Sequence, residues 1–210
     1  MRRLSGRSVS ARGIPRTSLA KTLASRRAAA PPAIGLLLLL AGDLQAAQVG
    51  INGPAGSEFF GNSVTVLSNG NIVVTDPGFD APGPITDVGA VYLYRPDGSL
   101  ISTLRGGSVS DQVGSSGVIV LSNGNFVVRS ALWDNGAAVN AGAATFGSGS
   151  SGISGVVSPA NSLVGSSAND SVGSVTALSN GNYVVQSVLW DNGAVVDAGR
   201  RPLRPRRWRR

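Results

Sequence analysis

The 210-residue chain contains no cysteine and no histidine. Without cysteine it forms no disulfide, and it lacks both the thiol nucleophile and the thiolate ligands of many zinc sites. Without histidine it lacks the side chain that most often acts as a general base or a metal ligand near neutral pH. These absences disfavour the common enzyme classes, and they favour a fold that is stabilised by apolar burial.

Long hydrophobic runs are also missing. The longest, Ala33–Ala41, is shorter than the roughly 20 residues that a membrane-spanning helix needs. It follows a segment with eight lysines and arginines and no acid, and it precedes small residues at Ala46 and Ala47. This order is typical of a secretory signal peptide, so residues 1–47 are predicted to be one, with a long basic n-region and cleavage after Ala46 or Ala47. The mature chain would be periplasmic, extracellular or on the cell surface; the alternatives are an organellar transit peptide over residues 1–30 and a buried core helix.

Positive charge is scarce in the middle of the chain. Residues 43–199 carry three arginines against eleven acids, a net charge of −8, whereas residues 1–42 carry +8 and residues 200–210 carry +7. A domain that tracks nucleic acid places its positive charge on the fold itself. The charge distribution therefore disfavours nucleic acid as a partner.

One eleven-residue motif occurs three times, at residues 64–74, 118–128 and 175–185, and each copy contains the sequence Leu-Ser-Asn-Gly-Asn. The turn residues of the copies are Asn69-Gly70, Asn123-Gly124 and Asn180-Gly181, spaced by 54 and 57 residues. A period of this length is typical of propellers and other repeat arrays. The sequence is therefore built from repeated units.

Asn-Gly between two apolar runs predicts a β-hairpin with a two-residue type I′ turn. In the first copy, Leu67 would then face Ile72 and Val66 would face Val73. The corresponding pairs in the later copies are Leu121–Phe126, Val120–Val127, Leu178–Tyr183 and Ala177–Val184. Both faces of such a hairpin are apolar, so we expect cover on both sides.

A second hairpin, with Pro96-Asp97-Gly98 as its turn, follows the first and gives four short strands in roughly 55 residues, the content of a propeller blade. The predicted fold is all-β, with antiparallel four-stranded blades in a partial β-propeller. The β-repeat region spans residues 48–199, with units at about 59–110, 111–169 and 170–199, the last truncated. Because propellers close with 4 to 8 blades, we expect the unclosed edge to support self-association.

Phe60-Gly61, Gly89-Ala90-Val91-Tyr92 and the recurring Val-Gly-Ser resemble the FG-GAP repeats of integrin-α-like β-propellers. The fuller pattern, with Leu-Trp-Asp-Asn-Gly, resembles a repeat of large bacterial secreted or surface proteins. The resemblance implies a propeller and a surface role. FG-GAP blades often hold calcium in an Asp-x-Asp-x-Asp-Gly loop, but Leu-Ser-Asn-Gly-Asn has too few carboxylates for that ion. No metal or other cofactor is therefore predicted.

Asp134 and Asp191 suggest a catalytic carboxylate pair for glycoside hydrolysis. They are, however, the same position in successive repeats, so we interpret them as residues that close a turn. Trp133 and Trp190 would stack on a sugar or fill the space between sheets, and packing is favoured. Asp111 and Asp170, which precede Val-Gly in two units, are predicted to cap turns.

The repeat stops at Gly199, where an arginine-rich tail replaces the expected strand. The tail, residues 200–210, could be a basic segment that binds an acidic partner. We favour the alternative that it results from a shifted reading frame or a truncated gene. The predicted function is a non-catalytic, exported binding or adhesion module for an unknown protein or glycan. The alternatives are a secreted carbohydrate-active enzyme, with an acid unique to one unit such as Glu58 or Asp87, and a truncated product without function.

Overall fold

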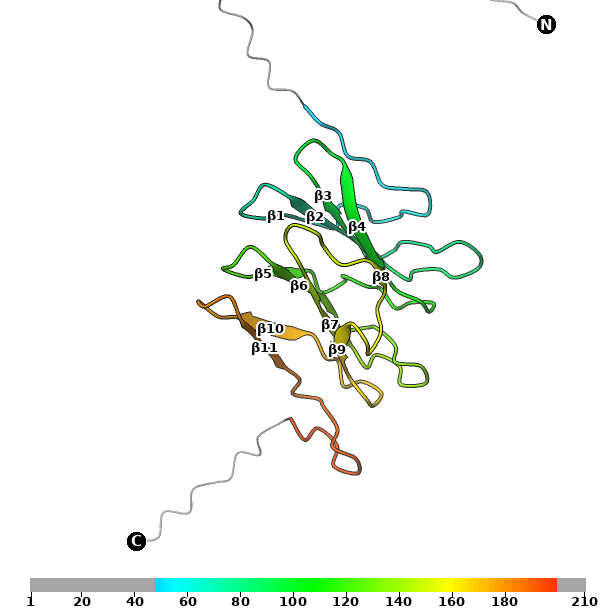
Figure 1. Ribbon diagram of the computed structural model, residues 1–210. Coiled ribbons are helices and arrows are strands. Elements are labelled where there is room, and N and C mark those ends of the chain that lie inside the picture. Colours follow the sequence, from blue (N-terminus) through cyan, green and yellow to red (C-terminus); the bar gives the residue numbers. More distant parts are fainter. Residues whose placement is uncertain (1–47, 200–210) are drawn as a thin grey trace, which may run out of the picture. The chain divides into compact units, whose positions relative to one another are not determined.

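The computed structural model describes residues 48–199 (Figure 1). The predicted signal peptide and the basic tail lie outside the described residues. Within them the chain forms strands and no helix, so the prediction of an all-β fold is confirmed. The strands are β1 (Ser63–Val66), β2 (Ile72–Asp76), β3 (Ala90–Tyr94), β4 (Leu100–Arg105), β5 (Val118–Val120), β6 (Phe126–Ser130), β7 (Ala143–Gly147), β8 (Gly155–Val156), β9 (Ser162–Val164), β10 (Ser174–Ala177) and β11 (Tyr183–Gln186).

The strands form three sheets, one for each repeat unit. The first has the order β1-β2-β3-β4-β8, the second β5-β6-β7-β9, and the third contains only β10 and β11. The first four strands of sheet one, and all of sheet two, are antiparallel, as the four-stranded blade pattern predicted. The short strand β8 lies between β7 and β9 in the sequence but pairs in parallel with β4, and so it fastens the second unit to the first.

The Asn-Gly hairpins have a longer loop than the predicted two residues. Leu67 N–H donates to Asn71 O and Gly70 N–H donates to Leu67 O, at 2.8 and 2.9 Å, and Gly70 has φ of 84°. This is a three-residue loop, a type I turn followed by a left-handed glycine. The Asn69 side chain accepts the Asn71 N–H at 3.1 Å, an Asx turn that holds Asn69 itself at negative φ.

The predicted strand register is consequently wrong by one residue. Ile72 faces Val66 rather than Leu67, and the same shift gives Val120↔Phe126 and Ala177↔Tyr183 in the later copies. A shift of one exchanges the faces of a strand. Leu67 therefore shares a face with Val73, and both lie in the core between the first two sheets.

The sheets are stacked (Figure 1), and three layers of apolar side chains stabilise the stack. The largest lies between sheets one and two and contains Leu93 and Leu104 from the first and Phe126 and Val128 from the second. A second layer covers the outer face of sheet one with Phe60, Phe79 and other residues outside the strands. A third joins sheet two to β10 and β11. The expected cover on both faces is present at β2 and β6, whereas Val64 and Val66 of β1 are exposed.

No helix in residues 48–199 has the length and apolarity that crossing a membrane would require.

Candidate binding site

Two repeated aspartates organise the junctions between units. The Asp111 carboxylate accepts N–H groups from Gly107 and Ser108 at 2.7 and 2.8 Å and from Asp134 at 3.1 Å. Asp170 accepts the equivalent three, from Ser166, Ser167 and Asp191, at 2.8 to 2.9 Å. Both carboxylates are almost fully buried. Each one ties the turn that starts its own unit to the Trp-Asp-Asn-Gly loop of that unit.

The pKa values of these two carboxyls are shifted in opposite directions, although their hydrogen bonds are equivalent. Burial raises the pKa of Asp111, although backbone N–H groups oppose this effect. At Asp170 the effect of burial is outweighed by the N–H donors of Ser167, Asp191 and Ser166, and the pKa is lowered. The difference follows from position, because Asp111 lies between two complete sheets whereas the sheet beside Asp170 has only two strands.

Asp134 and Asp191, considered above as a catalytic pair, each hold a loop of their own unit. Asp134 Oδ1 accepts the Asn140 N–H at 2.7 Å, and Asp191 Oδ1 accepts the Asp197 N–H at 2.8 Å. The structure places each beside the capping aspartate of its own unit, and no hydrogen bond within residues 48–199 joins the two.

The first unit contains the same loop, which the sequence reasoning missed. Asp80 Oδ1 accepts the Asp87 N–H at 2.8 Å, and Asp87, Asn140 and Asp197 have φ of 54°, 53° and 52°. The 54-residue offset from Asp80 to Asp134 was the available signal. The description of Asp87 as an acid unique to one unit is therefore wrong, because Asn140 and Asp197 are its structural equivalents. Glu58 is exposed.

The two tryptophans lie in different surroundings. Trp133 is 5 % exposed and belongs to the core between sheets one and two, whereas Trp190 is 39 % exposed at the incomplete third sheet. Phe79 occupies the corresponding position in the first unit, one residue before Asp80, and is also buried. Trp133 therefore fills space between sheets one and two, and Phe79 fills space on the outer face of sheet one.

Side chains of the Asn-Gly turns bond to main-chain carbonyls of the next unit. Asn69 and Asn71 both donate to Gly149 O at 2.8 Å. Asn123 donates to Gly181 O at 3.0 Å, and the Ser122 hydroxyl donates to Ser179 O at 3.0 Å. The repeated turn residues thus connect each sheet to the next.

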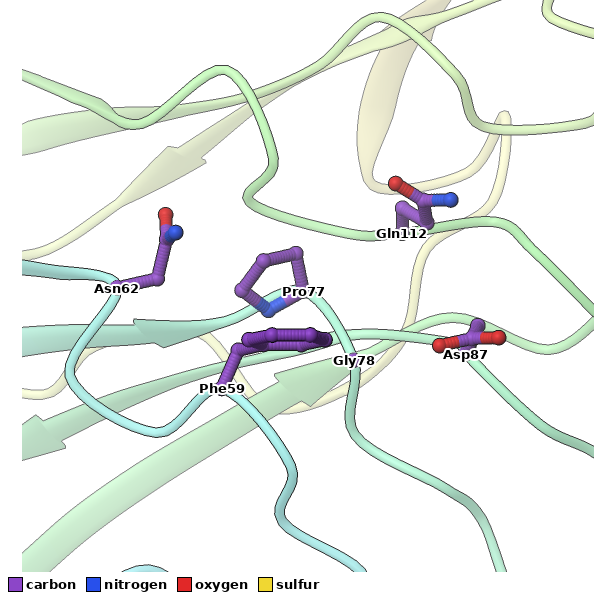
Figure 2. A pocket seen from close by; sticks show the side chains of 6 residues that line it. All are labelled: Phe59, Asn62, Pro77, Gly78, Asp87 and Gln112. Atoms are coloured by element: carbon purple, nitrogen blue, oxygen red, sulfur yellow. The ribbon is translucent and has the colours of Figure 1, made fainter.

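A concave site lies where the first unit meets the start of the second (Figure 2). Its volume is about 230 Å³, and its lining residues are Phe59, Asn62, Pro77, Gly78, Asp87 and Gln112. In the view of Figure 2, Asn62 lies on one side of the Phe59 ring, and Asp87 and Gln112 lie on the other. We call this site the Phe59 pocket.

The main chain around the Phe59 pocket is well anchored. Phe59 N–H donates to the buried Asp76 carboxylate at 2.9 Å, and Asn62 N–H donates to Phe59 O at the same distance. Across the pocket, Gln112 N–H donates to Asp87 O at 3.0 Å. Within residues 48–199 the side chains of Asn62, Asp87 and Gln112 have no hydrogen-bond partner, so they are available to a ligand.

A second cavity, of about 310 Å³, lies on the outer face of β3 and β4, where Tyr92, Tyr94 and Phe79 line it together with Arg105. Burial, with smaller effects of Asp76 and Tyr94, raises the pKa of the Tyr92 hydroxyl well above its ordinary value. This cavity is more apolar than the Phe59 pocket. Among residues 48–199 there is no group of three or more acidic side chains that could hold a metal ion.

The fold and these contacts define a repeat protein built from stacked antiparallel sheets. Residues 120–174 and 177–200 match the model of a repeat of unknown function (DUF5650). No curated protein matches the chain, and neither does any solved structure.

Proposed function

We propose that the protein is an exported, non-catalytic binding or adhesion module whose repeats form part of a β-propeller of FG-GAP type. The observation that carries the proposal is the use of the repeated acids. Asp134 and Asp191 bind backbone N–H groups within their own units, and Asp111 and Asp170 bind N–H groups on both sides of the junction that precedes their units, so all four build the scaffold. A scaffold of this kind presents loops and pockets to a partner, as propeller blades do.

The sequence supports the site of action. Its basic start, apolar run and small residues near Ala46 and Ala47 are typical of export, and the lack of cysteine places no requirement on redox state. Fractionation of cells that express the full chain with a C-terminal epitope tag tests this part. We expect the processed protein outside the cytoplasm, with a new N-terminus at Ala47 or Gln48; an unprocessed cytoplasmic protein would contradict it.

Binding and turnover are separated by a single experiment on the purified, exported protein. It is incubated with a panel of insoluble polysaccharides and with fixed cells, and both retention on the surface and release of reducing ends are measured. We expect saturable retention without release. Release that is lost in Glu58→Gln would establish instead the carbohydrate-active enzyme.

The third sheet supports self-association. Within residues 48–199 it has two strands instead of four, and Val184, Val195 and Val196 are exposed around it. Unpaired strand edges beside apolar surface favour pairing with another chain. We expect light scattering to give a mass above that of one chain, and Val184→Lys to lower it; a monomer at all concentrations would argue against this part.

A further inference from the structure

We propose that the Phe59 pocket binds a single neutral sugar ring, such as the terminal hexose of a surface glycan. This inference rests on the proposed binding function and names the ligand class and the residues that would recognise it. Features that all repeat units share build the fold, whereas features found in one unit need another explanation.

Three departures from the repeat meet in this pocket. Residues Ser130-Ala131-Leu132-Trp133 and Ser187-Val188-Leu189-Trp190 correspond to Asp76-Pro77-Gly78-Phe79 in the first unit. Asp76 replaces a serine and Gly78 replaces a leucine. Phe59 stands where the second unit has Gly114, because the two N–H groups donate to the side chains of the equivalent residues Asp76 and Ser130, at 2.9 and 3.1 Å.

Two of the departures, Phe59 and Gly78, depend on one another physically. The bond between Asp76 and the Phe59 N–H, in contrast, has a counterpart in the second unit, where the Ser130 hydroxyl accepts the Gly114 N–H. The Asp76 carboxylate holds the Phe59 N–H, and the edge of the Phe59 ring lies against Gly78. A Cβ at Gly78 would collide with that ring, so a leucine there would displace it. The φ of Gly78 is not in the left-handed region, so the glycine provides space for the ring rather than a special backbone conformation.

The ring is not placed there for burial. Phe59 is 57 % exposed, so much of its apolar surface stays in contact with water. An exposed aromatic ring on an anchored main chain is a platform for an apolar surface of a ligand. The C–H face of a pyranose is such a surface.

The polar groups around the ring select the ligand class. Asn62 and Gln112 each offer an amide donor and an acceptor, and Asp87 offers carboxylate acceptors. Among the residues that the structure describes, Asp87 is the only charged one in the lining, so anionic ligands are disfavoured. A quaternary ammonium would use one aromatic ring and Asp87 but could not bond to either amide, whereas vicinal sugar hydroxyls donate and accept at once. A volume of about 230 Å³ is below the roughly 300–1,000 Å³ of sites for larger small molecules and suits one ring.

Saturation-transfer NMR on the purified full-length chain tests the proposal, with methyl β-glucoside, methyl β-galactoside and methyl α-mannoside as neutral probes and tetramethylammonium as the cationic probe. We expect saturation of at least one hexoside. Phe59→Ala should weaken its binding by about tenfold, the effect of losing one aromatic contact. Leu163→Ala is the matched control, because Leu163 is also 57 % exposed but lies on β9 outside the pocket; it should leave binding unchanged.

Asp87→Asn separates the two ligand classes. Asparagine is found at the equivalent position 140, with the same left-handed backbone, so the loop should fold normally. Hexoside binding should fall less than in Phe59→Ala, whereas binding of a cation would be lost. The proposal would be overturned if only tetramethylammonium bound, or if no probe bound to a protein that unfolds cooperatively. Equal hexoside binding by Phe59→Ala and the wild type would also overturn it.

If Phe59→Ala does not fold, the labelled wild-type protein provides the answer. The side-chain amide signals of Asn62 and Gln112 should shift on addition of the hexoside, and unchanged signals at saturation would refute the site. Adhesion is scored separately on fixed cells. Adhesion without hexoside binding would refute the sugar site but support the proposed function. Hexoside binding without adhesion would support the sugar site but refute the adhesion function.

Discussion

Replacing Asp111 with alanine should cost about 2–4 kcal/mol of the free energy of unfolding. The carboxylate accepts three backbone N–H groups, and a hydrogen bond to a charged group contributes roughly 1.5–3 kcal/mol. Two effects bring the sum down. Gly107 and Ser108 are exposed, so water can replace the carboxylate at their N–H groups. Burial raises the pKa of Asp111, so loss of the charged group also removes a desolvation cost.

The assay is urea unfolding, followed by the fluorescence of the buried Trp133. The midpoint should fall without a change in slope, because the variant loses stability while the surface exposed on unfolding stays the same. Asp111→Asn keeps the shape but offers one acceptor oxygen, and it should cost less than alanine does. Asp97→Ala, in an exposed turn, is the control and should leave the midpoint nearly unchanged. A loss below about 1 kcal/mol for Asp111→Ala would refute the role of this carboxylate as the link between unit start and loop.

Three further predictions concern other parts of the repeat. The lowered pKa of Asp170 stabilises the fold above pH 4, so the stability advantage over Asp170→Asn should be lost as the pH falls from about 4 towards the folded-state pKa; a constant difference in unfolding free energy from pH 6 to pH 3 would contradict this. Trp133→Ala should cost about 3–5 kcal/mol and Trp190→Ala clearly less, because only the first side chain is enclosed by two complete sheets; denaturant midpoints compare them. Gly89→Ala should abolish cooperative unfolding or lower the melting temperature strongly, because a Cβ there would meet the backbone of the next unit. Gly83→Ala is the control, since Gly83 also has positive φ but faces open space, and its effect should be mild. Equal melting temperatures for the two variants would show that the close approach at Gly89 is absent.

The contrast between Asp134 and Asp87 shows how far repeated sequence can be used to assign roles. Asp134 was assigned a turn because it recurs at Asp191, and it does hold a loop in the structure. The sequence presents Asp87 as unique because Asn140 differs in type, and because Asp87 follows Asp80 by seven residues whereas Asn140 and Asp197 follow Asp134 and Asp191 by six. Their shared backbone conformation appears only in three dimensions.

Local sequence determined the strands and the units. Alternating apolar residues and recurring turn residues fix where a strand starts and ends, because these preferences act within a few residues. The four-stranded antiparallel sheets and the all-β class follow from that pattern. The hairpin register did not follow, because the choice between a two-residue and a three-residue loop depends on whether the Asn69 side chain bonds to Asn71, a preference too small to read from the letters Asn-Gly alone.

Only the tertiary structure decided which residues meet between units. The parallel pairing of β8 with β4, and the approach of Gln112 to Phe59, join segments about 50 residues apart in the sequence whose contacts no local preference encodes. The sequence by itself determined a repeat in which each of three units contains the same Asn-Gly hairpin. The tertiary structure decided which altered residues of the first unit meet in a pocket. The sequence does not indicate why residue 78 is glycine, because the reason is the Phe59 ring that lies against it in three dimensions.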